Sequence, residues 1–336
     1  MKVSVIIPVF RVSAYIERCI ASVAHQTFTD VECLMIDDAS DDDSIERAAT
    51  WLRDHTGPIH FRTILHDRNV GLSAARNTGI LAAQGDYLFF LDGDDALPID
   101  SLERLMQVAT RFPDVDMVQG GSEIIGSTDN NQRYLLRQRL PDFSSDEAWI
   151  GKSLLERKLI PVTSWNKLIR RTWLMDNNLL FKEGLLHEDE HWTYMAAAFV
   201  HSMAFCKETT YSHFVNEGSI MRSQADKSIQ SWMVILEECV LNQHDSLLLS
   251  RRKFILEVAY CNLVRIVKKG SKHQRNDNID VLKRVMGPFA LDVRRKGSWL
   301  ECWLLKWFEL PLPFLNITCA KHVKGLFFRL LDTLPS

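Results

Sequence analysis

The chain has 336 residues, of which 46% are hydrophobic, and a net charge of −3, so its composition fits a globular protein of roughly two domains. Its seven cysteines include no C-x-x-C pair, which argues against zinc ribbons and a disulfide framework and fits a reducing compartment. No uncharged apolar run reaches the roughly 18 residues of a membrane-spanning helix, and the start "MKVSVIIPVF" is unlike a signal peptide. We therefore expect a cytoplasmic protein.

Strand-like and helix-like segments alternate over the first hundred residues. We expect strands at residues 3–10, 31–37, 59–66 and 87–92, and helices at residues 13–28, 44–56 and 72–84. Repeated strand–helix–strand units produce a mostly parallel sheet that is flanked by helices. The predicted fold class is therefore α/β, and a ligand should bind beyond the carboxyl ends of the strands.

The patterns that follow are weaker and lead into a part of different charge. We expect helices at residues 101–112 and 187–199, strands at 115–125 and 201–215, and a polar excursion at 127–145. Residues 251–336 hold 17 Lys and Arg but only 7 Asp and Glu, whereas residues 1–250 hold 23 and 36. We expect a first domain at residues 1–222, in halves 1–98 and 99–222, and a basic, aromatic-rich helical region at 223–336.

The segment "DYLFFLDGDDALP" ends an apolar run in three carboxylates, Asp92, Asp94 and Asp95. Apolar runs rich in aromatic residues are typical of buried strands, and a buried carboxylate without a partner is costly. Carboxylate oxygens suit a hard divalent cation such as Mg²⁺ or Mn²⁺. Because Asp and Gly also favour turns, the cluster taken alone fits an ordinary turn equally well.

Four motifs follow one another along the chain: "IIPVF", "MIDDAS", "GLSAARNTGI" and "LDGDD". Together they resemble the family 2 glycosyltransferases, which have a Rossmann-like GT-A-type fold, over roughly residues 3–220. The resemblance implies a nucleotide-binding first half and an acceptor-binding second half of the first domain. The chain departs from the family pattern at Phe10, Arg11 and Ala39, and we expect an ordinary backbone conformation at Ala39.

The resemblance also implies a nucleotide-sugar site that is built from motif residues. Asp38 would accept a hydrogen bond from the N–H group of uracil, and Pro8 and Phe10 would line the base pocket. Arg76 would face the diphosphate of the donor. Three of these residues have plainer alternatives. Asp38 also suits a turn or the N-cap of the following helix, although Asp37 fits that role better. Phe10 also suits the core, and Arg76 also suits an exposed helix face.

Asp92 and Asp94 form a D-x-D pair, and side chains two residues apart on an extended segment point to the same side. By resemblance, Asp94 binds Mn²⁺ or Mg²⁺ and Asp92 contacts sugar or ribose hydroxyls. The metal ion would stabilise the departing diphosphate. Asp95 is either a further metal ligand or a cap of the next turn, and we favour the cap. His213 is either a further metal ligand or a structural residue.

The segment "GLLHEDEHW" carries the motif of the acceptor half. A sugar hydroxyl is a weak nucleophile, so transfer requires a base within hydrogen-bond reach. By resemblance, Asp189 is that base and Glu188 contacts the acceptor, although acids in a first helical turn also complement the helix dipole. Trp192 would offer a platform to an acceptor sugar or belong to the core. In "SWNKLIRR", Asn166 and Lys167 are either substrate contacts or structural residues.

Tryptophans recur at helical spacing near the end of the chain, at Trp299, Trp303 and Trp307. A basic segment with an aromatic stripe fits a peripheral contact with the inner face of the cell membrane. It fits equally well a helical subdomain that packs its tryptophans inward. A nucleic-acid partner is not expected, because the body of the chain is acidic and no binding motif is present.

The sequence therefore predicts an inverting, metal-dependent glycosyltransferase. Its donor would be a UDP-sugar, and its acceptor a hydroxyl of a growing bacterial surface glycan (capsule, lipopolysaccharide or exopolysaccharide), free or lipid-linked. The alternative is an inactive, membrane-associated adaptor that binds nucleotide sugars, against which the intact Asp38, Asp92, Asp94 and Asp189 argue. An aspartyl phosphatase is disfavoured, because its D-x-D motif usually follows the first strand and here the motif follows the fourth.

Overall fold

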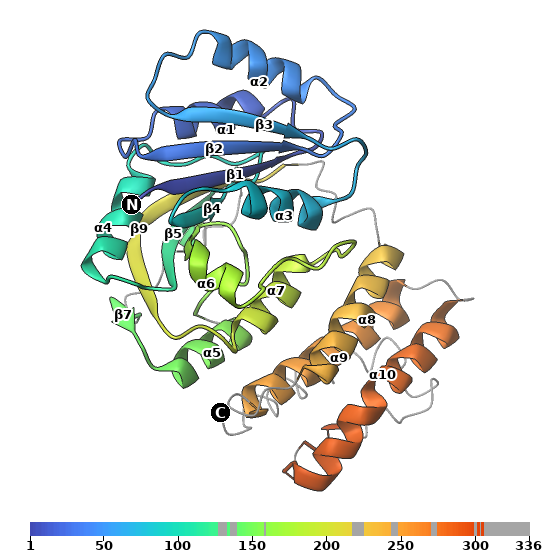
Figure 1. Cartoon of the computed structure of the whole chain (residues 1–336). Coiled ribbons are helices and arrows are strands. Elements are labelled where there is room, and N and C mark those ends of the chain that lie inside the picture. Colours follow the sequence, from blue (N-terminus) through green and yellow to red (C-terminus); the bar gives the residue numbers. More distant parts are fainter. Residues whose placement is uncertain are drawn as a thin grey trace. The chain divides into compact units, whose positions relative to one another are not determined.

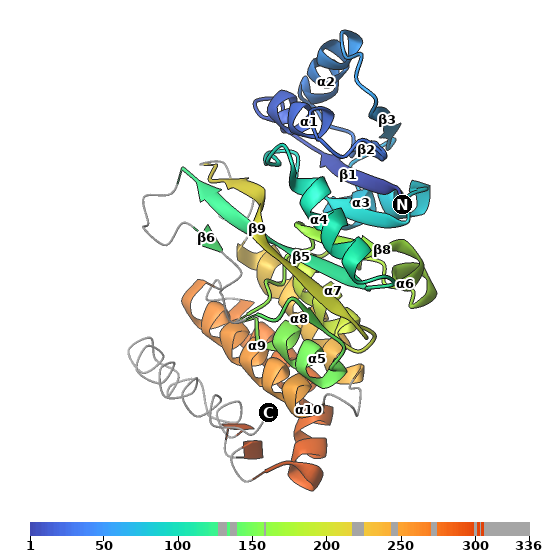
Figure 2. The ribbon, with the colours of Figure 1, turned by 90° about the vertical axis from the view of Figure 1, so that its left-hand side faces the viewer.

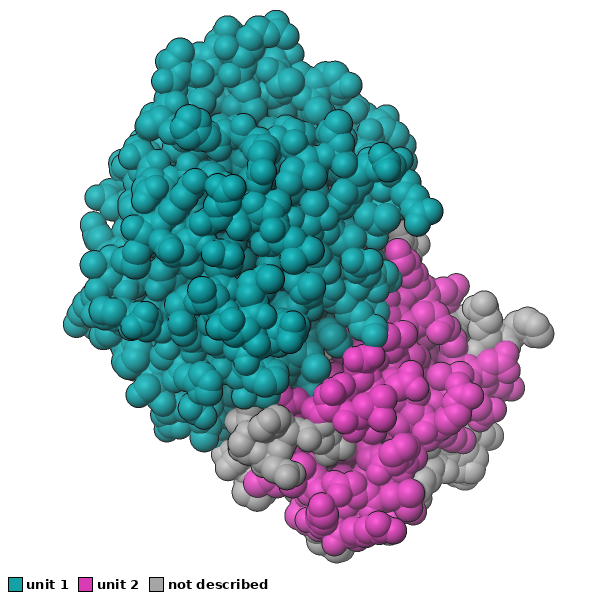
Figure 3. Space-filling model, viewed as in Figure 1, with its two compact units in different colours: residues 1–217 teal, residues 218–336 magenta. Residues whose placement is uncertain are grey.

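The chain forms two compact units, Met1–Glu217 and Gly218–Ser336 (Figure 3). The computed structural model describes residues 1–126, 133–134, 140–157, 159–216, 225–242, 248–269, 274–298, 301–302 and 304–305. The expected domain boundary at residues 222 and 223 falls among residues 217–224, outside the described part of the chain. The first unit contains the sheet, and the described elements of the second unit are helices.

The first four strands form the parallel part of the sheet. They are β1 (Val3–Val9), β2 (Val31–Asp37), β3 (His60–Leu65) and β4 (Tyr87–Phe90). The helices that connect them are α1 (Ile16–Ala24), α2 (Ser44–Arg53) and α3 (Leu72–Ala82). β1 lies between β2 and β4, and β3 pairs with β2 at the edge (Figure 1). The predicted α/β class and the order of these seven elements are confirmed.

The sheet continues with mixed pairings in the second half of the unit. Its elements are α4 (Ser101–Arg111), β5 (Met117–Ile125), β6 (Arg133–Tyr134), β7 (Phe143–Ser144), α5 (Glu147–Glu156), β8 (Lys167–Arg170), α6 (Arg171–Asp176), α7 (Glu188–Ala196) and β9 (Met203–Phe214). Within the described residues the strand order is β3-β2-β1-β4-β8-β5-β9-β7, with β6 on β5. β8 is antiparallel to both β4 and β5, whereas β5 and β9 run parallel and side by side (Figures 1 and 2).

Helices cover both faces of the parallel strands. Residues of α1, α2 and α4 share one core cluster with alternate residues of β1, so these helices lie on one face. α3 covers the other face, where Gly79 approaches Ile6 so closely that an added Cβ would lie 2.3 Å from Ile6 Cγ2. Burial on both faces explains the continuous apolar run of β1. The carboxyl ends of β1, β2 and β4 therefore meet at one edge of the sheet.

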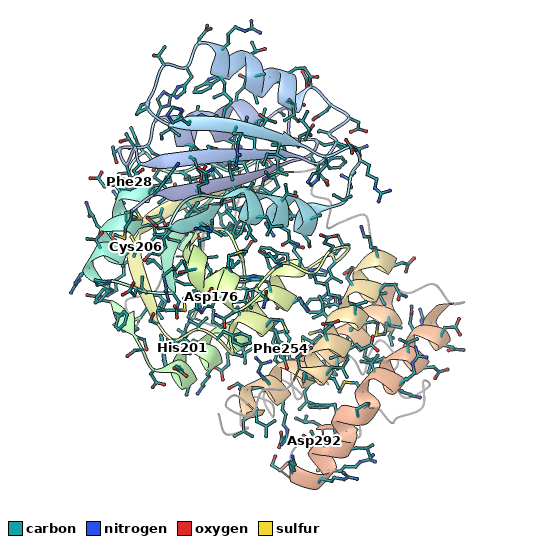
Figure 4. The ribbon with its side chains drawn as sticks, in the orientation of Figure 1. Phe28, Asp176, His201, Cys206, Phe254 and Asp292 are labelled. Atoms are coloured by element: carbon teal, nitrogen blue, oxygen red, sulfur yellow. The ribbon has the colours of Figure 1, made fainter. Side chains whose placement is uncertain are left out.

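The described part of the second unit consists mainly of α8 (Ala225–Leu241), α9 (Leu248–Lys269) and α10 (Gln274–Lys296). Arg252 of α9 is buried and pairs at 2.6 Å with Asp292. Figure 4 labels Asp292 on α10. Among the residues that the structure describes, no helix has both the length and the hydropathy to span a bilayer. The predicted stripe of Trp299, Trp303 and Trp307 lies outside the described residues.

Candidate active site

The turn Asp92–Asp95 begins where β4 ends and lies against the end of β1. The N–H of Asp95 donates to the carbonyl of Asp92 at 3.0 Å, which closes the turn. Gly93 favours this close approach, because an added Cβ would lie 3.0 Å from the carbonyl oxygen of Pro8, which is a tight contact. The close packing places the acidic turn at the edge where α/β sheets bind their ligands.

The sequence had predicted that Asp95 caps the next turn. The structure shows instead that Asp95 connects the acidic turn to β9. Its carboxylate is fully buried and accepts hydrogen bonds from the hydroxyl of Tyr211 (2.8 Å), from Nδ1 of His213 (3.0 Å) and from the N–H of Phe214 (2.8 Å). The hydrogen bond with Asp95 raises the pKa of His213. The prediction was wrong because these partners come from a strand far away along the chain.

Arg76 of α3 joins carboxylates from both halves of the unit. Its side chain is 1% exposed. Nη1 donates to Oε1 of Glu188 (2.7 Å) and Oδ1 of Asp189 (3.1 Å), and Nη2 donates to Oδ1 of Asp92 (3.0 Å). Arg76 is therefore not an exposed helix residue, and its guanidinium already has three carboxylate partners in the protein. The structure brings Asp92, Glu188 and Asp189 together around one guanidinium.

One guanidinium does not neutralise the carboxylates around it. Burial raises the pKa of Asp92 to about 7 and outweighs the opposing effect of Arg76. Burial also raises the pKa of Asp94 and of Glu188. The side chain of Asp189 remains 18% exposed. The three carboxylates around Arg76 outnumber its single positive charge, and a cation bound beside them would stabilise their ionised forms.

Asp94 and His213, the predicted metal ligands, both bind protein groups. Oδ2 of Asp94 accepts a hydrogen bond from Nδ2 of Asn216 at 2.8 Å, and Nδ1 of His213 binds Asp95. In the described ranges, no three His, Cys, Asp or Glu side chains are arranged to hold a metal ion. The chemistry of the donor set, with carboxylate and amide oxygens beside an imidazole, nevertheless fits Mn²⁺ or Mg²⁺.

The predicted base-pocket residues lie at the ends of β1 and β2. Pro8 is buried within β1, and Phe10 follows this strand with a partly exposed side chain. Asp38 is buried, and its carboxylate accepts hydrogen bonds from the N–H groups of Val70 (2.9 Å) and Gly71 (2.7 Å). Asp38 thereby fixes the loop that leads into α3, whereas the structural alternative from the sequence was a local turn or the N-cap of the helix that follows it.

The backbone beside this pocket is strained at two residues that depart from the family pattern. Ala39 has a φ of +53° and Arg11 a φ of +54°. The expectation of an ordinary conformation at Ala39 was wrong, because the turn keeps the left-handed geometry that suits Gly. Each such residue costs about 1–2 kcal/mol. The side chain of Arg11 pairs with Asp41 at 2.6 Å and helps to hold the turn.

Trp192 is a core residue in this structure and offers no platform to a sugar. It is 1% exposed, its Nε1 donates to the carbonyl of Leu179 at 2.8 Å, and its ring stacks on Phe181 with centroids 5.6 Å apart. The two alternatives for Trp192 could not be separated from the sequence, because the direction of this face of α7 depends on how the helix packs. The structure selects the core alternative.

Asn166 and Lys167 have structural contacts and fix the turn that contains Trp165. Asn166 has a φ of +58°, and its Nδ2 donates to two backbone carbonyls of β5 at 2.9 Å each. Lys167 is fully buried, and its Nζ donates to the carbonyls of Pro161 and Thr163. Burial lowers the pKa of Lys167 to about 7.

Two aromatic residues that the sequence did not single out lie beside the acidic turn. The ring of Trp165 stacks on Tyr211 (centroids 4.5 Å apart, 19° between planes) and on His213 (5.7 Å, 11°). The hydroxyl of Tyr211 contacts both Asp95 and the N–H of Asp92 (3.2 Å). The sequence signal that could have revealed this cluster was the spacing of Tyr211 and His213. Residues two apart in a strand place their side chains on the same face.

Comparison with known proteins identifies the class of this site. Residues 4–176 match the model of glycosyl transferase family 2. The chain belongs to this family. The glycosyltransferase is 28% identical to EpsH of Bacillus subtilis, itself provisionally assigned as a glycosyltransferase, over 98% of this chain and 97% of that protein.

Solved structures of other glycosyltransferases share the fold. TarS of S. aureus in complex with UDP-GlcNAc aligns with a TM-score of 0.66 and 20% identity, over 86% of this chain and 81% of that chain. The mannosyltransferase PcManGT of Pyrobaculum calidifontis, in complex with GDP-Man and Mn²⁺, aligns with a TM-score of 0.55 and 14% identity, over 98% and 85%. These similarities confirm the predicted GT-A-type fold of the glycosyltransferase.

Proposed function

We propose that this glycosyltransferase moves a sugar from a UDP-sugar to a hydroxyl of a growing surface glycan, with inversion at the anomeric carbon. The observation that carries the proposal is the guanidinium of Arg76, which binds Asp92 at 3.0 Å and Asp189 at 3.1 Å. A donor contact and a candidate base are thereby held at a fixed separation. A single displacement requires such an arrangement, because the alcohol and the donor must be oriented before they react.

Asp189 is the proposed general base. Its Oδ1 is bound by Arg76, which orients the carboxylate, and its side chain is 18% exposed and so accessible to an acceptor hydroxyl. Glu188, which shares Nη1 of Arg76, is the proposed acceptor contact. Inversion follows from attack by the acceptor itself, since retention by double displacement would require a protein nucleophile on the opposite face of the sugar.

Asp94, with His213 as a further ligand, is proposed to hold Mn²⁺ or Mg²⁺. Asp94 would exchange its hydrogen bond with Asn216 for the ion, and the neighbouring carboxylate of Asp95 would add to the attraction of this turn for a cation. A divalent cation bound there would neutralise charge on the departing diphosphate. Asp92, on the same turn, is the proposed contact to sugar or ribose hydroxyls. The Mn²⁺ in the complex of PcManGT supports the choice of ion.

The nucleotide is proposed to bind at Pro8, Phe10 and Asp38. Phe10 is partly exposed at the end of β1, where its ring can stack on a base. Asp38 is proposed to accept the uracil N–H while it holds the loop at Val70 and Gly71. The complex of TarS with UDP-GlcNAc supports a uridine nucleotide. Arg76 is proposed to act on the donor through Asp92, since its guanidinium is already bound by carboxylates.

The acceptor is proposed to be a bacterial surface glycan, free or lipid-linked, and the enzyme to act at the cytoplasmic face of the membrane. The basic charge of the C-terminal region supports a peripheral contact with anionic lipids, since residues 251–336 hold 17 Lys and Arg against 7 Asp and Glu. Sedimentation with anionic and neutral vesicles tests this contact. Equal sedimentation of the full chain and a chain that ends at residue 297 would contradict a contact through the last 39 residues.

A donor panel with Asp189→Asn tests the proposed chemistry. UDP-glucose, UDP-galactose and their N-acetylhexosamine counterparts are titrated calorimetrically with and without Mn²⁺, and transfer is followed by release of UDP. We expect Mn²⁺-dependent donor binding in both proteins and a loss of transfer by about 10²–10⁴-fold in Asp189→Asn. Asp176→Asn, at the exposed end of α6 (Figure 4), is the control. Absence of any UDP-sugar binding would refute the donor, and full turnover of Asp189→Asn would refute the base.

A further inference from the structure

An acceptor glycan needs an apolar surface beside the base. A hexopyranose presents one face of C–H groups, which packs on an aromatic ring, and its hydroxyls then point to polar groups at the rim. Trp192 cannot supply this surface because it is buried. We propose that Trp165 is the platform for the acceptor pyranose, an inference that rests on the proposed function and adds a binding residue to it.

Trp165 lies in a turn that is bound to both sides of the candidate site. On one side, Oγ1 of Thr193 donates to the carbonyl of Val162 at 2.9 Å. Thr193 is four residues after Asp189 on α7, so the two side chains lie on the same face of the helix. On the other side, the ring of Trp165 stacks on His213, which contacts the acidic turn. The segment that carries Trp165 is therefore bound to the helix of the proposed base, and the indole itself is linked to the acidic turn through His213.

The two stacked rings cover the same face of the indole. The hydroxyl of Tyr211 (2.8 Å) and Nδ1 of His213 (3.0 Å) both bind Oδ2 of Asp95, which places these two atoms less than about 6 Å apart. A ring inserted between the two side chains would hold them about 7 Å apart or more, because each pair of stacked faces needs about 3.5 Å. Trp165 is nevertheless partly exposed, so part of the indole remains open to a ligand.

The turn itself is preorganised. Asn166 keeps a left-handed backbone through its two hydrogen bonds to β5, and the buried ammonium of Lys167 binds two carbonyls of the residues before Trp165. A platform that is already held in place loses little conformational freedom when a sugar binds. The structural roles of Asn166 and Lys167 therefore serve the placement of Trp165.

Substitutions at Trp165 test the platform through acceptor KM and kcat. The probes are the octyl β-glycosides of glucose, galactose and N-acetylglucosamine, with the UDP-sugar that the wild type uses. Trp165→Ala should raise the acceptor KM about tenfold or more, and Trp165→Phe should restore part of the loss. The affinities for UDP and Mn²⁺ should stay unchanged. Trp149→Phe is the matched control, since Trp149 is also partly buried and packs edge-to-face on Phe205, towards the other end of β9.

Three results would overturn the platform. One is an acceptor KM of Trp165→Ala equal to that of the wild type. Another is a loss of Mn²⁺ affinity in Trp165→Ala as large as the rise of its acceptor KM, which would show that Trp165 merely supports His213. The third is a wild-type enzyme that binds UDP with Mn²⁺ but neither glycosylates nor binds any of the pyranosides. Failure of the wild type to bind any UDP-sugar would instead refute the proposed function.

Discussion

Replacement of Arg76 by Met should strongly destabilise the first unit. The guanidinium is 1% exposed and is shared by Asp92, Glu188 and Asp189 at 2.7–3.1 Å. Met fills a similar volume, so the main effect is that buried carboxylates lose their cation. Breaking a buried ion pair costs about 3–5 kcal/mol. In a unit of this size each kcal/mol lowers Tm by about 2–4 °C, so we expect a decrease of about 6–20 °C.

Thermal unfolding followed by circular dichroism, without added metal, measures this effect. Arg11→Met is the matched control, because the pair of Arg11 and Asp41 is 62% and 61% exposed and is screened by solvent, so its loss should change the Tm far less. Arg76→Met combined with Glu188→Gln should recover part of the lost stability, since one of the orphaned carboxylates is then uncharged. A Tm of Arg76→Met that matches the control would refute this account of Arg76, and so would a double variant less stable than the single one.

Two further predictions concern titration. Burial lowers the pKa of Lys167 to about 7, so between about pH 7 and 10 the unfolded chain binds a proton that the folded chain does not. The stability of the wild type relative to Lys167→Met should therefore rise over this range, by at most about 1.4 kcal/mol per pH unit, and a pH-independent difference in urea unfolding would contradict it. Asp95→Asn should lower the pKa of His213, because the hydrogen bond with Asp95 raises it; an unchanged NMR titration of the metal-free protein would count against this contact.

The parallel half of the sheet could be predicted because its signals are local. In α1, the buried residues Ile16, Cys19, Ile20 and Val23 recur at helical spacing, and this pattern is visible in the sequence alone. β8 could not be predicted, because it has only four residues and two of them, Lys167 and Arg170, are charged. Its identity as a strand depends on pairing with β4 and β5, which are distant in sequence.

The sequence motifs grouped several acidic residues that the structure brings together, but their contacts could not be predicted. Motif order placed Asp92 and Asp189 in one site, yet their common partner Arg76 lies 16 residues from one and 113 from the other. The sequence offered Trp192 as the sugar platform, whereas we propose Trp165 from the structure, and this difference has a similar cause. Both are tryptophans near the predicted base, and only the packing of α7 and of the turn before β8 decides which ring is buried.

The insertion of β8 between β4 and β5 has a consequence for the way substrates enter. Continuous ladders of backbone hydrogen bonds run from the strand before the acidic turn to the strands of the acceptor half. A hinge motion that separates the two halves of the first unit would break these hydrogen bonds, so such a motion is disfavoured. We therefore expect any movement that accompanies substrate exchange to lie in the loops around this edge of the sheet, and not between the two halves of the unit.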